Sequence, residues 1–288
     1  IFLNSQETLF TLVDNSKTGI NFSNELVDTK EHSIFLYANY YGGAGVGIGD
    51  FDNDGLEDIF FAANLLDDKI YKNLGNFEFE DKTKMSGIIN NGSWSTGVTV
   101  ADVNNDGLLD IYVSCELYDD VPLLRRNKLY INQGSFKFKE SASEWGVDVD
   151  RRTRHSVFFD YNKDGLLDLY LLNHPPNTGN FSPFFGKDMS LPEYNLQLFE
   201  NKGNHFVDVT QSAGLSRSGF PNAAVIGDFN KDGWPDIYVA NDFDSPDFLY
   251  FNNKDKTFTY ATETSLRHTS FYSMGVDAAD INNDSHLD

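Results

Sequence analysis

The sequence is poor in cysteine, in positive charge and in long apolar runs. Cys115 is the single cysteine among 288 residues, so no internal disulfide can hold the fold together if the protein is secreted. With 22 basic side chains against 44 acidic ones, the formal charge is -22, which excludes nucleic acid as a partner. No apolar run approaches the roughly 20 residues of a membrane helix, so we expect no direct membrane span. The first residue is Ile1 rather than Met, which is compatible with the removal of a signal peptide or lipid anchor.

One acidic nonapeptide is abundant instead, in five copies. These are DFDNDGLED at 50–58, DVNNDGLLD at 102–110, DYNKDGLLD at 160–168, DFNKDGWPD at 228–236 and DINNDSHLD at 280–288. Their first residues lie 52, 58, 68 and 52 positions apart. Such a period is typical of propellers and solenoids, in which each repeat is one supersecondary unit that packs against its neighbours.

The nonapeptides predict calcium loops. Each has Asp at position 1, Asp or Asn at position 3 and Asp at positions 5 and 9, and so many carboxylates repel one another unless a hard cation neutralises them. Calcium takes roughly 6 to 8 oxygen ligands, which these side chains and the backbone carbonyl of position 7 would supply. We therefore predict up to five calcium ions, bound by Asp50, Asp52, Asp54, Leu56, Asp58, Asp102, Asn104, Asp106, Leu108, Asp110, Asp160, Asn162, Asp164, Leu166, Asp168, Asp228, Asn230, Asp232, Trp234, Asp236, Asp280, Asn282, Asp284, His286 and Asp288.

Two other interpretations of the nonapeptide are weaker. A solvated acidic turn would account for one copy but not for five matched copies. An EF-hand needs flanking helices and a Glu at position 12, where this sequence has Phe61, Val113, Leu171 and Val239. Position 6 is Gly in four copies and Ser285 in the fifth, so we expect the fifth site to be the weakest, because a left-handed conformation there costs roughly 1 to 2 kcal/mol.

Four short segments accompany each of the first four loops, and the fifth has only the preceding one, MGVDAA at 274–279, which is predicted as an inner strand. The segment before the loop, such as TGVTVA, is rich in small residues, as expected where inner strands crowd around an axis. The segment after it, such as LLDIYVSCE, is apolar on both faces, which is typical of a strand covered on both sides and would bury Cys115. A third segment, such as KLYIN, and a fourth, such as FKFKES, complete the unit. Without a helix signal, the pattern predicts an all-β fold, a β-propeller of four-stranded blades with the calcium loops between the first and second strands.

These motifs resemble the FG-GAP and VCBS repeat families, whose calcium-loop blades are shared with the integrin α-chain propeller. The YxN-x-G-x-F-x-D-x-T endings, as at 71–83, make the chain similar to bacterial proteins related to cartilage acidic protein, which often precede an ASPIC/UnbV region. The resemblance implies a ring of seven or eight blades, of which about four and a half are visible.

The domain organisation expected from this resemblance is a single propeller domain over residues 1–288, incomplete at its C-terminus. It would comprise an N-terminal segment at 1–40 and blades at 41–288. Within the N-terminal segment, LFTLVDNSKTGI at 9–20 matches the fourth-strand pattern FEFEDKTKMSGI at 77–88 and predicts a ring-closing outer strand.

The face opposite the calcium loops is the predicted recognition surface. Antiparallel strands place on it the loops between second and third strands and the links between blades, which vary in length and hold all seven arginines. We hypothesise that arginine forks and aromatic rings bind an anionic ligand there. The candidates are Arg125, Arg126, Arg151, Arg152, Arg154, Arg217, Arg267, Trp94, Phe184 and Phe185. In the alternative, these arginines brace the loops by pairing with Asp119, Asp120, Asp148 and Asp150.

The predicted function is ligand recognition or protein interaction outside the cytoplasm, by a protein that is secreted or at the cell surface, with lipid anchoring to an outer membrane left open. Extracellular calcium modules bind at roughly 10⁻⁴ to 10⁻³ M, which cytosolic calcium cannot saturate. The expected partners are an acidic glycan or a protein or peptide ligand, and other subunits of an outer-membrane complex. No nucleophile elbow, zincin helix or Walker loop occurs, so no catalytic residue is predicted. A polysaccharide-active hydrolase or lyase and a structural assembly subunit remain alternatives.

Overall fold

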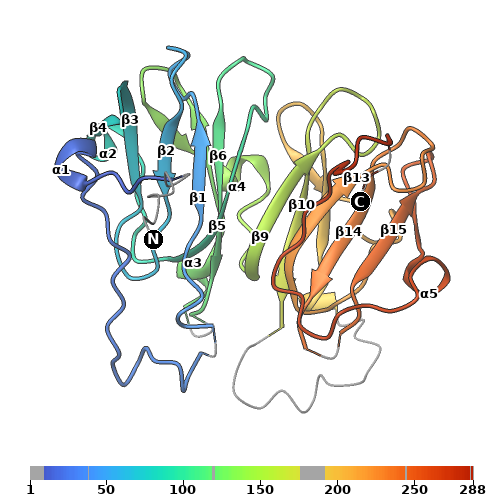
Figure 1. The fold of residues 1–288 in the computed structure, drawn as a ribbon. Coiled ribbons are helices and arrows are strands. Elements are labelled where there is room, and N and C mark those ends of the chain that lie inside the picture. Colours follow the sequence, from blue (N-terminus) through green and yellow to red (C-terminus); the bar gives the residue numbers. More distant parts are fainter. Residues whose placement is uncertain are drawn as a thin grey trace, which may run out of the picture.

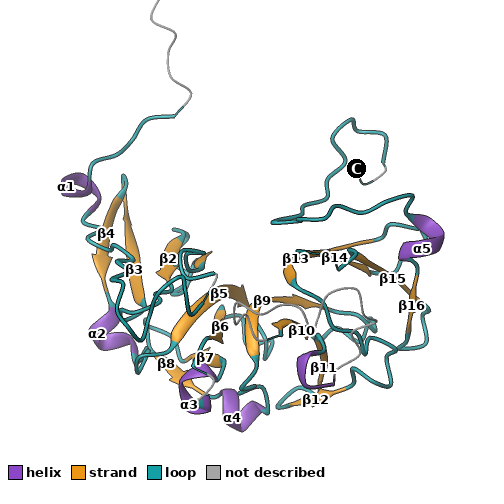
Figure 2. Ribbon diagram, turned by 90° about the horizontal axis from the view of Figure 1, so that it is seen from below, coloured by secondary structure: helices purple, strands orange, loops and turns teal. Residues whose placement is uncertain are grey.

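Four antiparallel sheets follow one another around an open arc (Figures 1 and 2). The computed structural model describes residues 10–37, 39–118, 121–175, 192–243, 245–285 and 287. In each sheet four strands that are consecutive in the chain lie side by side in order, and all the pairs are antiparallel. This is the blade arrangement that the repeats predict, and the fold is that of a β-propeller.

The strands of each blade lie where the four apolar segments predict them. Blade 1 consists of β1 (Val46–Gly49), β2 (Asp58–Phe61), β3 (Lys69–Gly75) and β4 (Glu78–Asp81). Blade 2 consists of β5 (Trp94–Ala101), β6 (Asp110–Glu116), β7 (Lys128–Asn132) and β8 (Phe138–Glu140). Blade 3 consists of β9 (Arg152–Phe159), β10 (Asp168–His174), β11 (Gln197–Asn201) and β12 (Phe206–Asp208). Blade 4 consists of β13 (Pro221–Gly227), β14 (Asp236–Asn241), β15 (Phe248–Asn252) and β16 (Phe258–Tyr260).

The first strands of the blades crowd together on the inner side of the arc, as the small residues in them predict. Figure 2 shows the outer strands β4, β8, β12 and β16 on the outer side. A Cβ atom added to Gly97 of β5 would lie 2.8 Å from the carbonyl oxygen of Arg154 on β9. One added to Gly45, just before β1, would lie 2.6 Å from the backbone nitrogen of Val98. Glycine is therefore needed at these positions because neighbouring blades leave no room for a side chain.

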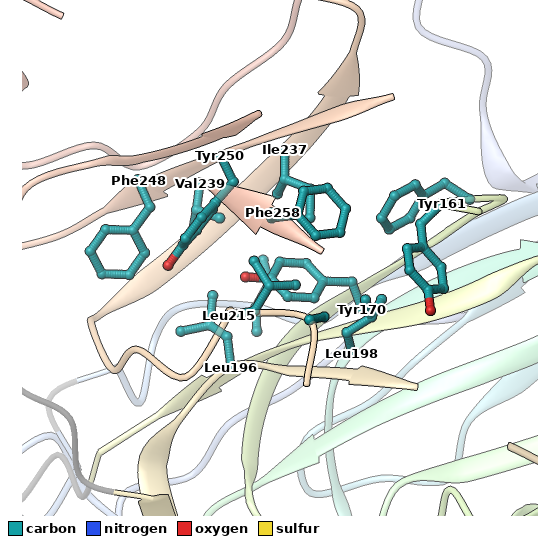
Figure 3. Packing of buried hydrophobic residues seen from close by; sticks show 13 residues of the cluster. Tyr161, Tyr170, Leu196, Leu198, Leu215, Ile237, Val239, Phe248, Tyr250 and Phe258 are labelled. Carbon is teal, nitrogen blue, oxygen red and sulfur yellow. The ribbon is translucent and has the colours of Figure 1, made fainter. Parts of the chain in front are cut away.

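Apolar side chains fill the spaces between successive blades. Every residue of β6 and β10 is buried, which confirms that the second strands are covered on both faces. Figure 3 shows the core between blades 3 and 4, where Ile237 and Val239 of β14 face Tyr170 of β10 and Leu198 of β11. Cys115 is fully buried in the core between blades 1 and 2, as predicted, and burial raises the pKa of its thiol to about 11.

The fold is nearly all-β, as predicted, and a few short helices that the sequence did not signal lie outside the strands. Three of them follow the outer strands of blades 1, 2 and 4: α2 (Thr83–Ser86), α4 (Ala142–Trp145) and α5 (Thr262–Ser265). Two others, α3 (Pro122–Arg125) and the 3-10 helix η1 (Pro192–Tyr194), lie between second and third strands, and α1 (Asn15–Thr18) lies near the N-terminus. Each is a single turn of three or four residues, which is too short to produce a helical hydrophobic period in the sequence.

The N-terminal segment matches part of the blade pattern. Residues 10–13 form no strand, so the ring-closing strand is not formed in the part of 9–20 that the structure describes. The turn after it is nevertheless formed. Gly19 follows α1 with φ 72, and a Cβ there would lie 2.7 Å from the carbonyl oxygen of Phe79 on β4. Gly87 after α2 is placed in the same way, 2.5 Å from the carbonyl oxygen of Phe138 on β8. Residues 15–19 therefore occupy, against blade 1, the place that the end of blade 1 occupies against blade 2.

The start of a fifth blade is represented by its loop alone. The segment at 274–279, predicted as an inner strand, forms no strand. No helix in the described ranges is long and apolar enough to cross a bilayer.

Candidate calcium loops and the opposite face

The first Asp of each nonapeptide organises its loop through backbone hydrogen bonds. In the second loop, Asp102 accepts the backbone N–H of Asp106 at 3.1 Å and that of Gly107 at 2.8 Å. The same pair of bonds forms in the other loops, with Asp50, Asp160, Asp228 and Asp280 as acceptors. The repeated sequence thus gives one repeated turn.

Two residues in each loop adopt left-handed backbone conformations. In the second loop they are Asn105 at position 4, with φ 56, and Gly107 at position 6, with φ 83. A Cβ on Gly107 would meet nothing within 4 Å, so the backbone conformation rather than space favours glycine there. In the fifth loop Ser285 has φ 66, the strained conformation on which the expectation of a weak fifth site rests.

In the loops of blades 1 to 4, the last Asp is buried and joins the loop to the sheet. Asp110 accepts the N–H of Val103 at 3.0 Å and that of Asn132, on β7, at 2.8 Å. Burial raises the pKa of Asp110 to about 7, and it likewise raises the pKa of Asp168 to about 7 and that of Asp58 to about 6. A carboxylate buried without a full counter-charge is in the environment in which a bound cation is most favourable.

The donor set of the first loop fits a hard divalent cation. Asp50, Asp52 and Asp58 each offer a carboxylate oxygen, and the three oxygens lie within 4.8 Å of one another. The Oδ1 atom of Asp52 is buried and has no hydrogen-bond partner in the described chain. Oxygen donors gathered in this way are the ligands that calcium prefers. In loops two to five, position 3 is Asn, and its side-chain oxygen accepts the N–H of position 5, as Asn104 does from Asp106 at 3.0 Å.

Successive loops are joined in a chain by the side chain at position 4. The amide of Asn53 donates to the carbonyl oxygen of Gly107 at 3.0 Å, and that of Asn105 donates to the carbonyl oxygen of Gly165 at 3.2 Å. The amine of Lys163 makes the equivalent bond to Gly233. Each acceptor is the position 6 carbonyl of the next loop, so neighbouring loops are in direct contact. Of the predicted metal ligands, His286 and Asp288 lie outside the described residues.

On the opposite face, three of the predicted arginines line one cavity. Arg125 at the end of α3, Arg151 just before β9 and Arg152 at its first residue border a space of about 490 Å³. His174, Tyr194, Asp150 and Glu193 complete its described lining. A second cavity of about 730 Å³ shares Arg151 and is lined mainly by hydroxyl and amide side chains. These include Asn195, Gln197, Thr210, Gln211, Ser212 and Ser216.

Arg125 and Arg151 also brace neighbouring segments, but through backbone carbonyl groups rather than through the predicted Asp side chains. Arg125 donates through Nε to the carbonyl oxygen of Asp150 at 2.6 Å. Arg151 donates to the carbonyl oxygens of Pro192 at 2.8 Å and Asn195 at 3.3 Å. These bonds fix the guanidinium groups at the cavity wall, so bracing and ligand binding are compatible here.

Three other arginine candidates contact neighbouring side chains away from this cavity. Arg126 pairs with Asp148 at 2.5 Å, which is one of the predicted braces. Arg154 pairs with the buried Glu116 at 3.0 Å. The guanidinium carbon of Arg217 lies 3.9 Å from the centre of the Tyr260 ring.

Several positions predicted for the recognition surface need correction. Arg152 and Arg154 lie within β9 rather than in a loop between blades. Trp94 is 1% exposed and packs against Tyr37 and Tyr40, so it cannot touch a ligand on this face. Arg267 is exposed and lines neither cavity. The candidates Phe184 and Phe185, and the predicted bracing acids Asp119 and Asp120, lie outside the described residues.

A buried ionic cluster on this side was not predicted. Glu116 is fully buried at the end of β6, and its Oε2 accepts hydrogen bonds from the Tyr37 hydroxyl at 2.5 Å and from Arg154 at 3.0 Å. Burial alone would raise the pKa of Glu116, but the charge of Arg154 and the hydrogen bond from Tyr37 lower it below its usual value. The sequence signal was a Glu at the end of an otherwise apolar strand, where a charge needs a partner.

The FG-GAP-like repeat family matches this chain at residues 50–113, 189–239 and 228–288, which together make up more than half of it. Cartilage acidic protein 1 of Xenopus tropicalis is 25% identical over 164 residues, which are 56% of this chain and 24% of that protein. The match thus spans about a quarter of the relative's length.

Two solved structures share parts of the fold. One is an Agrocybe aegerita lectin that recognises non-reducing terminal N-acetylglucosamine, with a TM-score of 0.43 and 18% identity over 74% of this chain and 50% of the lectin. The other is the V. cholerae biofilm matrix protein Bap1, with a TM-score of 0.34 and 14% identity over 77% of this chain and 30% of Bap1. Both scores are below 0.5, so nothing about ligands follows from these likenesses.

Proposed function

This chain belongs to the FG-GAP-like repeat family, and from that premise we propose that it is a calcium-binding propeller that works outside the cytoplasm and recognises an acidic glycan. The calcium loops stabilise the scaffold on one face, and the ligand binds on the other. The observation that carries the proposal is the cavity walled by Arg125, Arg151 and Arg152, since guanidinium groups from the end of α3 and from the start of β9 converge on one space.

Calcium is supported by the chemistry of the loops. Each complete nonapeptide places several carboxylates in one turn, and the last of them is buried with a raised pKa. Divalent ions would remove this repulsion. At the roughly 10⁻⁴ to 10⁻³ M affinity of extracellular calcium modules, the loops would be filled outside the cytoplasm but not within it.

An acidic ligand is favoured by the charge of the cavity wall. Guanidinium groups bind carboxylates and sulfates through paired N–H donors, and Arg125 and Arg151 are already held in place by backbone carbonyls. A glycan is favoured over a peptide by the second cavity, which continues past Arg151 and is lined by hydroxyl and amide groups. The ring of Tyr194 at the first cavity can stack on a sugar face.

Binding without catalysis fits the cavity better than hydrolysis or elimination does. His174 would be the natural base, but it is only 2% exposed and its Nε2 lies 3.0 Å from the carbonyl oxygen of Pro221. Burial lowers the pKa of His174 to about 4, so the ring stays neutral and sequestered. Turnover of acidic polysaccharides by the calcium-loaded protein would favour the enzyme alternative.

The test is a glycan array with calcium present, followed by titration of the best binder against two variants. Arg125→Gln removes a charge from the cavity wall and should weaken binding at least tenfold, since a charge-assisted hydrogen bond is worth roughly 1.5 to 3 kcal/mol. Arg126→Gln is the matched control, because Arg126 pairs with Asp148 and does not line the cavity.

Two results would contradict the proposal. One is that no acidic glycan on the array binds to the protein. The other is equal loss of affinity in Arg125→Gln and Arg126→Gln, which would indicate a general charge effect. Binding of acidic peptides in place of glycans would identify the other ligand class.

A further inference from the structure

A lysine of the third strand reaches into the first calcium loop. Lys72, on β3, donates to the Oδ2 atom of Asp52 and, at 2.5 Å, to the Oδ2 atom of Asp54. These are positions 3 and 5 of the loop. The ring of Phe136, from blade 2, lies 5.3 Å from the amine, and the Lys72 side chain is 19% exposed. The amine is therefore held at the loop by both blades rather than extended into solvent.

The corresponding position in the other blades carries no cation. Lys72 precedes Asn73 of β3, and the residue before the matching Asn of the third strand is Ile131 in blade 2, Glu200 in blade 3 and Phe251 in blade 4. In the fourth loop Lys254 approaches Asp232 at 3.4 Å, but it comes from the following turn and its side chain is 46% exposed. Among the described loops, the first alone has a lysine bound to both position 3 and position 5.

The lysine accompanies a change in the loop itself. Position 3 is Asp52 in the first loop and Asn in the other four. At its predicted ligand positions the first loop therefore has one more carboxylate than the others, and the charge of Lys72 compensates for it. With the lysine in place, Asp50, Asp52 and Asp58 still offer oxygens within 4.8 Å of one another, and Asp52 Oδ1 is still buried without a partner in the described chain. The donor set thus remains suited to a cation while one cation is already beside it.

We propose that Lys72 is a built-in counter-cation of the first loop, which keeps that loop folded without metal and makes it the weaker calcium site relative to the loops of blades 2 to 4. A positive charge a few ångströms from a divalent ion repels it, so calcium must either displace the amine or bind against its field. The inference rests on the proposed calcium function. The first loop then differs from the others in its need for calcium. Blade 1 stays ordered at calcium concentrations at which the other loops lose their ions.

The experiment measures calcium bound per chain by equilibrium dialysis over a range of free calcium, for the wild type and Lys72→Ile. Isoleucine is the residue that blade 2 has at this position. Besides the weak fifth site, the wild type should show one site that binds calcium more weakly than the three sites of blades 2 to 4, and the variant should bind about tenfold more tightly at that site. Without calcium, the variant should melt at a lower temperature than the wild type, because the carboxylates lose their counter-charge.

Three further variants make the outcome specific. Lys72→Gln should behave like Lys72→Ile, and it serves if the apolar residue impairs folding. Asp52→Asn combined with Lys72→Ile gives the first loop the pattern of the second, and its binding should resemble that of the second loop. Lys69→Ile is the control, because Lys69 lies on the same strand and pairs with Asp81 rather than with the loop. It should leave calcium binding unchanged.

The outcomes separate this inference from the function on which it rests. If calcium binds and the isotherms of the wild type, Lys72→Ile and Lys72→Gln coincide, the role of Lys72 is wrong while the calcium loops stand. If Lys69→Ile tightens binding as much as Lys72→Ile does, the effect is one of overall charge and the inference is again overturned. If no variant binds calcium, the proposed function and the inference both fail.

Discussion

The side-chain amide of Asn132 donates a hydrogen bond to the backbone carbonyl oxygen of Phe51 at 2.9 Å. Asn132 ends the third strand of blade 2, and Phe51 is position 2 of the first acidic loop, so this bond ties blade 2 to the loop of blade 1. Asn201 makes the same bond to Val103, and Asn252 makes it to Tyr161. The loops are thus part of the joint between blades.

Replacing Asn132 by Ala should lower the free energy of unfolding by about 1 to 3 kcal/mol, because it leaves buried carbonyl groups without a donor. The lost bonds include one to Leu109 of its own loop at 3.0 Å. Urea unfolding in saturating calcium measures the change. Gln133→Ala, at the exposed next position, is the control and should leave stability within about 0.5 kcal/mol of the wild type. Equal stability of Asn132→Ala and the wild type would mean that the hydrogen bonds of Asn132 do not hold blades 1 and 2 together.

Substitution of Gly97 by Ala should destabilise the protein through contact between β5 and β9. The new methyl group would lie 2.8 Å from the carbonyl oxygen of Arg154, and backbone on both strands must move to admit it. Overpacking of this kind costs roughly 1 to 3 kcal/mol. Thermal unfolding measures the loss of stability. Ala223→Gly on β13 is the opposite substitution at the equivalent position, where blade 4 already has Ala. A stability gain in Gly97→Ala would contradict the crowding at the inner strands.

The buried pair of Glu116 and Arg154 should make stability depend on pH in acid. The pKa of Glu116 is lower in the folded protein than its ordinary value of about 4.3. Its ionisation therefore contributes stability above that value, and this contribution is lost as the pH falls through the lower, folded pKa. Glu116→Gln should cost about 3 to 5 kcal/mol at neutral pH, because Arg154 is left buried without its counter-charge.

The difference in unfolding free energy between the wild type and Glu116→Gln should shrink as the pH falls below about 4. Urea unfolding at a series of pH values measures it. Glu144→Gln removes an exposed partner of Lys139 and serves as the control, with an expected effect under about 1 kcal/mol. A difference that stays constant with pH would show that the charge of Glu116 contributes nothing.

Much of the fold could be predicted from the sequence because each repeat contains the same loop and strand signals. Asp50 and its equivalents locate the loops, and apolar residues such as Val113 show that a buried strand follows each loop. Gly97 predicted the close approach of inner strands. These signals are local, so they need no knowledge of which distant residues meet.

The parts that could not be predicted depend on contacts between distant residues or on very short elements. Arg154 meets Glu116 across two blades, and nothing in the spacing of the two residues indicates it. Trp94 was expected on the surface, but residues 37 and 40 fold over it. α2 and α4 are single turns without a helical period. The sequence predicted that the arginines lie on one face, but not which of them line a cavity together.

Thermal unfolding with saturating calcium and with a chelator tests the central claim, that the loops bind calcium and thereby hold the blades together. Five divalent ions would change the formal charge from -22 to -12, so binding relieves repulsion as well as favouring the folded state. We predict that chelation lowers the melting temperature by well over about 10 °C, since several sites each contribute on the order of 1 kcal/mol or more. An unchanged melting temperature would contradict the account.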